Sequence, residues 1–167
     1  HYIREDFTAP NPSIFGLTPK QFRKQLEELA KYGSFISKEE LVNFKNKEFN
    51  RNYLLITFDD GLREQYELAK PVLDEMGIPA IFFINTSNFQ DKDISLVHKI
   101  HLLRSQLSSD DILEALEKSN VAELNEKEKA LAIFHYNYDP ESNAVLKYLL
   151  NFRLGLKEQQ EFMDQLF

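Results

Sequence analysis

Leu54-Leu55-Ile56-Thr57-Phe58-Asp59-Asp60-Gly61 joins a continuous apolar run to two adjacent carboxylates and a glycine. An unbroken apolar run, rather than an alternating one, is typical of a β-strand that is covered on both faces. Proteins of the α/β class place binding and catalytic groups in the loops at the carboxyl ends of such strands. Adjacent aspartates repel each other, and each needs solvent or a cation. We therefore predict a functional site at Asp59 and Asp60.

The residues that follow predict a helix with an interruption. Apolar side chains recur at helical spacing over residues 62–76. Pro71 should kink this helix or divide it in two, because proline has no N–H to donate. Gly77 is placed to end it.

A second continuous apolar run, Ile78–Ile84, predicts another fully buried strand. Two strands joined by a helix run parallel, with their carboxyl ends at one edge of the sheet. We therefore expect residues 85–87 to lie on the same rim as Asp59 and Asp60. This part of the chain is predicted to be α/β.

Upstream of the central strand, two capping boxes mark helix starts. In a capping box, a Ser or Thr and the Glu or Gln three residues later bond each other's backbone amides. Thr18 with Gln21 and Ser37 with Glu40 have this spacing. Gly33 is expected to end the first of these two helices.

Residues 95–167 differ in character from those before them. Their apolar side chains recur at helical spacing, and no strand-like run is present. We therefore expect an α/β region over residues 1–94 and a helical insertion or tail of the same domain over residues 95–167. A small sheet that leads into helices alone is incomplete, which favours the interpretation that the chain is a fragment.

Charge and composition narrow the classes of function. The chain has 167 residues, a formal net charge of −7 and no cysteine. The negative charge argues against a nucleic-acid partner, because phosphates are bound by basic surfaces. The absence of cysteine excludes disulfides and thiolate chemistry. No apolar stretch is long enough to cross a membrane and no signal peptide is visible, so the sequence predicts no compartment.

Adjacent carboxylates at a strand end suit two kinds of chemistry. In one, a carboxylate binds a divalent metal while the other acts as general base on a metal-activated water. In the other, the pair holds Mg²⁺ for phosphoryl transfer, although phosphatases of this kind have two aspartates separated by one residue. A structural alternative is that the pair only complements the dipole of the following helix.

Leu55–Gly61, the helix after it and Gly77–Ile84 together resemble the first motif region of the polysaccharide deacetylases. These are the NodB-homology proteins, or carbohydrate esterase family 4. Residues 17–22 and 33–41 resemble the family's lead-in, and His1–Ile3 resembles its first strand. The resemblance covers residues 1–90. It implies a partial or distorted (β/α) barrel, here with a C-terminal all-helical insertion or extension.

This resemblance also implies roles for the two aspartates. Asp59 would be the general base, and Asp60 would be a ligand of a divalent metal, most often zinc. The family removes acetyl groups from sugars by metal-assisted hydrolysis, so the implied substrate is an acetylated glycan or sugar precursor. The metal polarises the acetyl carbonyl, and the base takes a proton from the attacking water. The alternative is a catalytically inactive NodB-like domain that binds a glycan or a partner.

The histidines depart from the family pattern. Family members complete the metal site with two histidines separated by three residues, whereas this chain has His1, His98, His101 and His135. His98 and His101 share one side of a predicted helix but have a different spacing. We therefore interpret them, like His135, as structural residues. The family's histidines are expected beyond Phe167, so that this chain would hold half of an active site.

Overall fold

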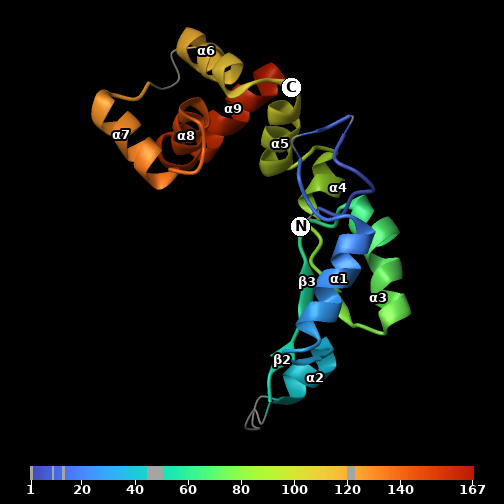
Figure 1. Ribbon diagram of the computed structural model, residues 1–167. Helices are drawn as coiled ribbons and strands as arrows, with labels where there is room; N and C mark the ends of the chain where they lie inside the picture. The colour runs from blue at the N-terminus through green and yellow to red at the C-terminus, as the bar shows by residue number, and fades with distance from the viewer. Residues whose placement is uncertain (1, 9, 13, 45–50, 120–122) are drawn as a thin grey trace. The chain divides into compact units, whose positions relative to one another are not determined.

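The computed structural model describes residues 2–8, 10–12, 14–44, 51–119 and 123–167 (Figure 1). The chain divides into two compact units, His1–Asp93 and Ile94–Phe167. Within the described residues, the first unit contains short strands and helices, and the second contains helices alone. His1, which was predicted to belong to a first strand, lies outside the described residues.

The first unit has the parallel strands of an α/β fold. Its elements are α1 (Pro19–Leu29), β1 (Ser34–Phe35), α2 (Lys38–Asn43), β2 (Tyr53–Leu54), β3 (Ile56–Phe58), the π-helical turn η2 (Gln65–Ala69), α3 (Lys70–Met76), β4 (Ala80–Phe82) and α4 (Ser87–Asp91). β1 pairs with β2, and β3 pairs with β4, both in parallel. Ile3 adds an isolated parallel bridge to Leu17. The predicted α/β class is confirmed, while the described strands form two-stranded sheets rather than a barrel.

Both predicted capping boxes are present. The Gln21 amide donates to Thr18 Oγ1 at 3.2 Å, and the Thr18 amide donates to Gln21 Oε1 at 2.8 Å. Ser37 and Glu40 make the same reciprocal pair at the start of α2. These local bonds begin both helices where the sequence predicts.

The prediction that Gly33 ends α1 was wrong. The helix ends at Leu29, and Ala30 is its C-cap. Gly33 is needed for a different reason, a close approach between two backbone segments. A Cβ on residue 33 would lie 2.7 Å from the carbonyl oxygen of Asn52, so any side chain here would push the segments apart.

The helix after β3 was expected to kink or divide at Pro71, but the structure shows it continuous from residue 63 to Met76, with a change of hydrogen-bond pattern just before Pro71. Residues Gln65–Ala69 form the π-helical turn η2, in which the Lys70 amide donates to the carbonyl of Gln65, five residues back. Pro71 is the second residue of α3, directly after the π-helical turn. Gly77 ends α3 in the left-handed conformation, with φ 63°, as predicted.

Aromatic side chains connect the sheet of β3 and β4 to the helices. The ring of Phe58 stacks on Phe82, with centroids 5.0 Å apart, and meets Phe22 of α1 edge-on at 5.9 Å. The same core includes Ile3, Leu26, Ala69, Val72 and Leu73. The helices α1, η2 and α3 therefore pack on the face of the sheet that carries Phe58 (Figure 1).

The prediction that Leu54–Phe58 and Ile78–Ile84 are strands covered on both faces was wrong. Thr57, which points away from Phe58, is exposed. β4 is half-buried throughout, and the two residues after it, Phe83 and Ile84, are 54% and 57% exposed. The exposure of Thr57, Phe83 and Ile84 therefore shows that, in the described part of the chain, these two segments are not covered on both faces.

The second unit packs its helices around a separate core. Its elements are α5 (Leu96–Gln106), α6 (Ser109–Ser119), α7 (Glu126–His135), α8 (Glu141–Tyr148), the π-helical turn η3 (Leu149–Arg153) and α9 (Leu156–Leu166). The fully buried side chains of this core include Ile112, Leu116, Leu146 and Met163. Within the described part of the chain, no helix has the length and apolar character needed to cross a membrane.

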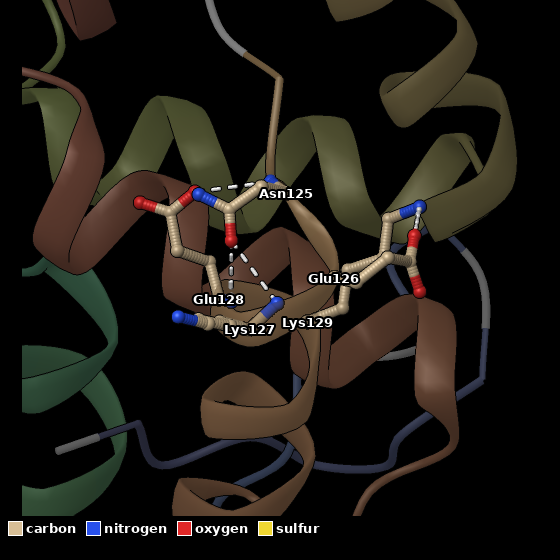
Figure 2. Close-up of polar contacts among 5 residues, drawn as sticks. All are labelled: Asn125, Glu126, Lys127, Glu128 and Lys129. Atoms are coloured by element: carbon tan, nitrogen blue, oxygen red, sulfur yellow. Dashed lines mark hydrogen bonds and ion pairs between the residues drawn. The ribbon is translucent and has the colours of Figure 1, made fainter.

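Polar contacts fix the ends of these helices. Figure 2 shows Asn125 capping α7: its Oδ1 accepts hydrogen bonds from the amides of Lys127 and Glu128, at 3.0 and 3.1 Å. Glu128 Oε2 in turn accepts from the Asn125 amide at 3.0 Å. Between helices, buried Lys99 of α5 pairs with Asp164 of α9 at 2.7 Å.

Candidate active site

Asp59 and Asp60 occupy a sharp turn directly after β3. Asp59 is exposed and Asp60 is half-buried. Asp60 has φ 72° and Gly61 has φ 64°, so two consecutive residues are left-handed. Glycine adopts this conformation freely, whereas an L-residue does so at a cost of up to about 1–2 kcal/mol. Backbone strain of this kind concentrates at functional sites.

This turn lies against the end of β4. Because β3 and β4 run parallel, their carboxyl ends share one edge of the sheet. A Cβ on Gly61 would lie 3.1 Å from Ile84 Cγ2, so a residue with a side chain would crowd Ile84. Beyond Ile84, Asn85 Oδ1 accepts hydrogen bonds from the amide and the hydroxyl of Ser87, at 3.2 and 2.7 Å. The predicted common rim is confirmed.

A buried glutamine, which the sequence analysis missed, holds the turn. Gln65 has no exposed surface. Its Nε2 donates to the carbonyl of Asp59 at 2.8 Å, and its Oε1 accepts from the amide of Leu62 at 3.2 Å. The sequence does contain a signal for this role: Gln65 is a polar residue four positions before Ala69, on a side of the helix that is otherwise apolar and buried.

Two further polar side chains lie close to the turn. Glu64 Oε1 accepts a hydrogen bond from the Ile3 amide at 3.2 Å, and burial raises the pKa of Glu64. Burial, together with the charges of Glu64 and Asp60, raises the pKa of Tyr2 to about 12. Tyr2 therefore remains a neutral hydroxyl at neutral pH.

The histidines of the second unit lie on the helices α5 and α7. His98 is buried and His101 is half-buried on α5. Burial lowers the pKa of His101, and the nearby Arg104 and His98 lower it further. His135 is exposed, and its ring stacks on Phe152 at 5.7 Å. These surroundings are those of side chains in helix–helix contacts.

The carboxylates of the turn can be compared with the ligands that a metal site needs. Carboxylate oxygens such as those of Asp59 and Asp60 suit a divalent cation. A catalytic zinc site needs about three protein ligands. Within the described ranges, no three His, Asp, Glu or Cys side chains come together in a group that could hold a metal ion. The two carboxylates therefore fit a fraction of the ligand set, and a complete zinc site needs donors from elsewhere.

A segment of the chain matches a known protein family. Residues 46–131, just over half of the chain, match the family model described as polysaccharide deacetylase. The matched segment contains the Asp59–Asp60 turn, the η2–α3 helix and β4, and it continues into the helical unit. Neither the curated proteins nor the solved structures gave a significant match.

Proposed function

Because the chain belongs to the polysaccharide deacetylase family, we propose that its Asp59–Asp60 turn serves the hydrolysis of acetyl groups on a glycan or sugar. The observation that carries the proposal is that the family match covers the strained turn with its two carboxylates. Family membership supports a hydrolase of amide bonds with an acetylated carbohydrate as substrate. The rim position of the turn suits this chemistry, since α/β folds bind ligands at the carboxyl ends of their strands.

Within this proposal, the two aspartates have different tasks. Asp59, exposed at the strand end, is the general base that takes a proton from the attacking water. Asp60 is one ligand of a divalent metal, with zinc as the first candidate. When bound, such a metal supplies Lewis-acid polarisation of the acetyl carbonyl.

We also propose that both units belong to one NodB-type domain. The strands would be part of a distorted (β/α) barrel, and the helical unit would be an insertion or extension of that domain. In support, the family match runs across the division between the two units at residue 93 and continues to residue 131. The parallel strands joined by helices are the expected components of such a barrel.

A second candidate is a catalytically inactive domain that binds a glycan or another partner. The observation that favours it is the incomplete set of metal ligands among the described residues. The presence of both Asp59 and Asp60 favours an active enzyme over an inactive domain, because the left-handed backbone at Asp60 costs free energy and such strain concentrates at functional sites.

Acetate release from an N-acetylated oligosaccharide, measured with added zinc, tests the proposal. Asp59→Asn removes the base while keeping the size of the side chain, so hydrolysis should fall about 10²- to 10⁴-fold. Asp74→Asn, which changes an exposed carboxylate of α3, is the matched control and should have no effect. Equal rates for the protein and Asp59→Asn, both above the rate without protein, would contradict the assignment of the base. Glycan binding without acetate release would support the inactive domain, and hydrolysis of phosphate esters would favour a phosphotransfer site.

A further inference from the structure

We infer that Gln65 is the positioning residue of this site: its buried amide fixes the backbone turn that carries Asp59 and Asp60. The chemical consequence of this inference rests on the proposed function, whereas the effect on the turn does not. Gln65 acts through the backbone, since its hydrogen bonds to Asp59 and Leu62 go to main-chain atoms.

The amide group of Gln65 holds the turn at both of its ends. Nε2 donates to the carbonyl of Asp59, and Oε1 accepts from the amide of Leu62. Between these two bonds lie Asp60 and Gly61, the two left-handed residues. A glutamine side chain has a donor and an acceptor on one planar group, so it can join a carbonyl and an N–H three residues apart.

Burial makes this arrangement specific. Gln65 has no exposed surface, so an amide that lost either partner would have no bulk water to replace it. Turn and side chain therefore stabilise each other. Without the two bonds, the left-handed turn loses this support, and negative φ is the favoured region for an L-residue such as Asp60. That change would re-aim the Asp60 carboxylate relative to Asp59.

Gln65 stands at the start of a π-helical turn. In this turn, Gln65–Ala69, the Lys70 amide donates to the carbonyl five residues back rather than the usual four. Its two end residues are both fully buried: Gln65 contacts the Asp59–Leu62 segment, and Ala69 belongs to the aromatic core. Single π-turns inside helices are frequent at functional sites.

The chain offers a matched control in its other unit. Gln159 of α9 is also buried, at 9% exposure, and its Nε2 donates to the carbonyls of Leu150 and Leu154 at 2.6 and 2.9 Å. Gln159→Met removes a buried amide with two backbone hydrogen bonds, as Gln65→Met does. A purely structural role for Gln65 predicts that both variants lose stability and that neither affects the site selectively.

The test compares the full chain with Gln65→Met and Gln159→Met by two measurements. NMR couplings and chemical shifts of Asp60 and Gly61 report their backbone conformation, and calorimetry with zinc alone reports metal binding. We expect Gln65→Met to lose the left-handed signature at Asp60 and to weaken zinc binding about 10- to 100-fold, the usual effect of removing a support of a metal site. Gln159→Met should lower the unfolding temperature and leave both readouts unchanged.

A left-handed Asp60 in folded Gln65→Met would overturn the inference, as would the same loss of conformation in Gln159→Met. If Gln65→Met does not fold, Gln65→Asn replaces it, because asparagine keeps the amide but is one methylene too short to span both partners. Its Asp60 should likewise leave the left-handed region, and an unchanged turn would again overturn the inference. A chain that binds no zinc would contradict the proposed function, while the conformation of Asp60 would still decide the role of Gln65.

Discussion

Replacing Gly61 by alanine tests the geometry of the turn, and Gly77→Ala provides its control. Both glycines are left-handed, with φ 64° at Gly61 and φ 63° at Gly77. They differ in their surroundings. A Cβ at Gly61 would lie 3.1 and 3.2 Å from two carbons of Ile84, whereas a Cβ at Gly77 would meet nothing within 4 Å.

The magnitude follows from two opposing effects. Holding an L-residue in the left-handed region costs about 1–2 kcal/mol. Alanine also has less conformational entropy than glycine in the unfolded chain, which raises the free energy of unfolding by about 0.4–1 kcal/mol. We therefore expect Gly77→Ala to lower the free energy of unfolding by about 1 kcal/mol. Gly61→Ala should lower the free energy of unfolding by about 1 kcal/mol plus a few tenths of a kcal/mol for the contact with Ile84. The extra cost is small because the exposed Ile84 can move aside.

Urea denaturation followed by circular dichroism measures both variants. In a unit of this size, about 1 kcal/mol corresponds to a fall of roughly 4–8 °C in unfolding temperature. Only Gly61→Ala should also weaken zinc binding, because only this glycine adjoins Asp60. A Gly61→Ala variant as stable as the unchanged protein would refute the left-handed turn after β3. If Gly77→Ala weakened zinc binding as much as Gly61→Ala does, the effect of Gly61→Ala would not be local to the site.

Three further predictions concern the rest of the fold. Thr18→Ala removes the cap of α1 and should lower the free energy of unfolding by about 0.5–2 kcal/mol in denaturation experiments, while Thr18→Ser should restore most of it. Burial lowers the pKa of His101 below its ordinary 6.5, so on acidification the unfolded chain takes up a proton at this histidine before the folded chain does. The free energy of unfolding therefore falls as the pH drops below about 6.5. His101→Gln should make the unfolding temperature depend less steeply on pH between pH 7 and 5, as measured in thermal melts. The hydrogen bond from Lys99 lowers the pKa of Asp164, so this ion pair stabilises the protein above the ordinary aspartate pKa and is lost in acid. Asp164→Asn should therefore lower the unfolding temperature at pH 7 but not at pH 2, and an equal loss at both would contradict the ion pair.

Local chemistry made part of the fold predictable. Thr18 and Ser37 cap helices through bonds that reach only three residues along the chain. Gly77 ends α3 because glycine alone adopts the left-handed conformation without cost. The parallel pairing of β3 and β4 follows from the helix that joins two apolar runs.

Contacts between distant segments explain what was missed. Gly33 resembles a helix end in the sequence, but its backbone contact is with Asn52, nineteen residues away. Apolar composition predicts that a strand can be covered, not which segments cover it, and Phe83 and Ile84 remain exposed. Gln65 is a polar residue in an apolar pattern, and its role depends on where the β3 turn lies in space.

The most direct test of the central claim is calorimetric titration of zinc into the chain and into its Asp60→Ala variant, with Asp74→Ala as control. If the turn after β3 is a metal-dependent deacetylase site, the chain should bind one zinc ion weakly, because the described residues provide an incomplete ligand set. Binding should disappear in Asp60→Ala and persist in Asp74→Ala. Equal zinc binding by Asp60→Ala and the unchanged chain, or no binding by either, would contradict the assignment of Asp60 as a metal ligand.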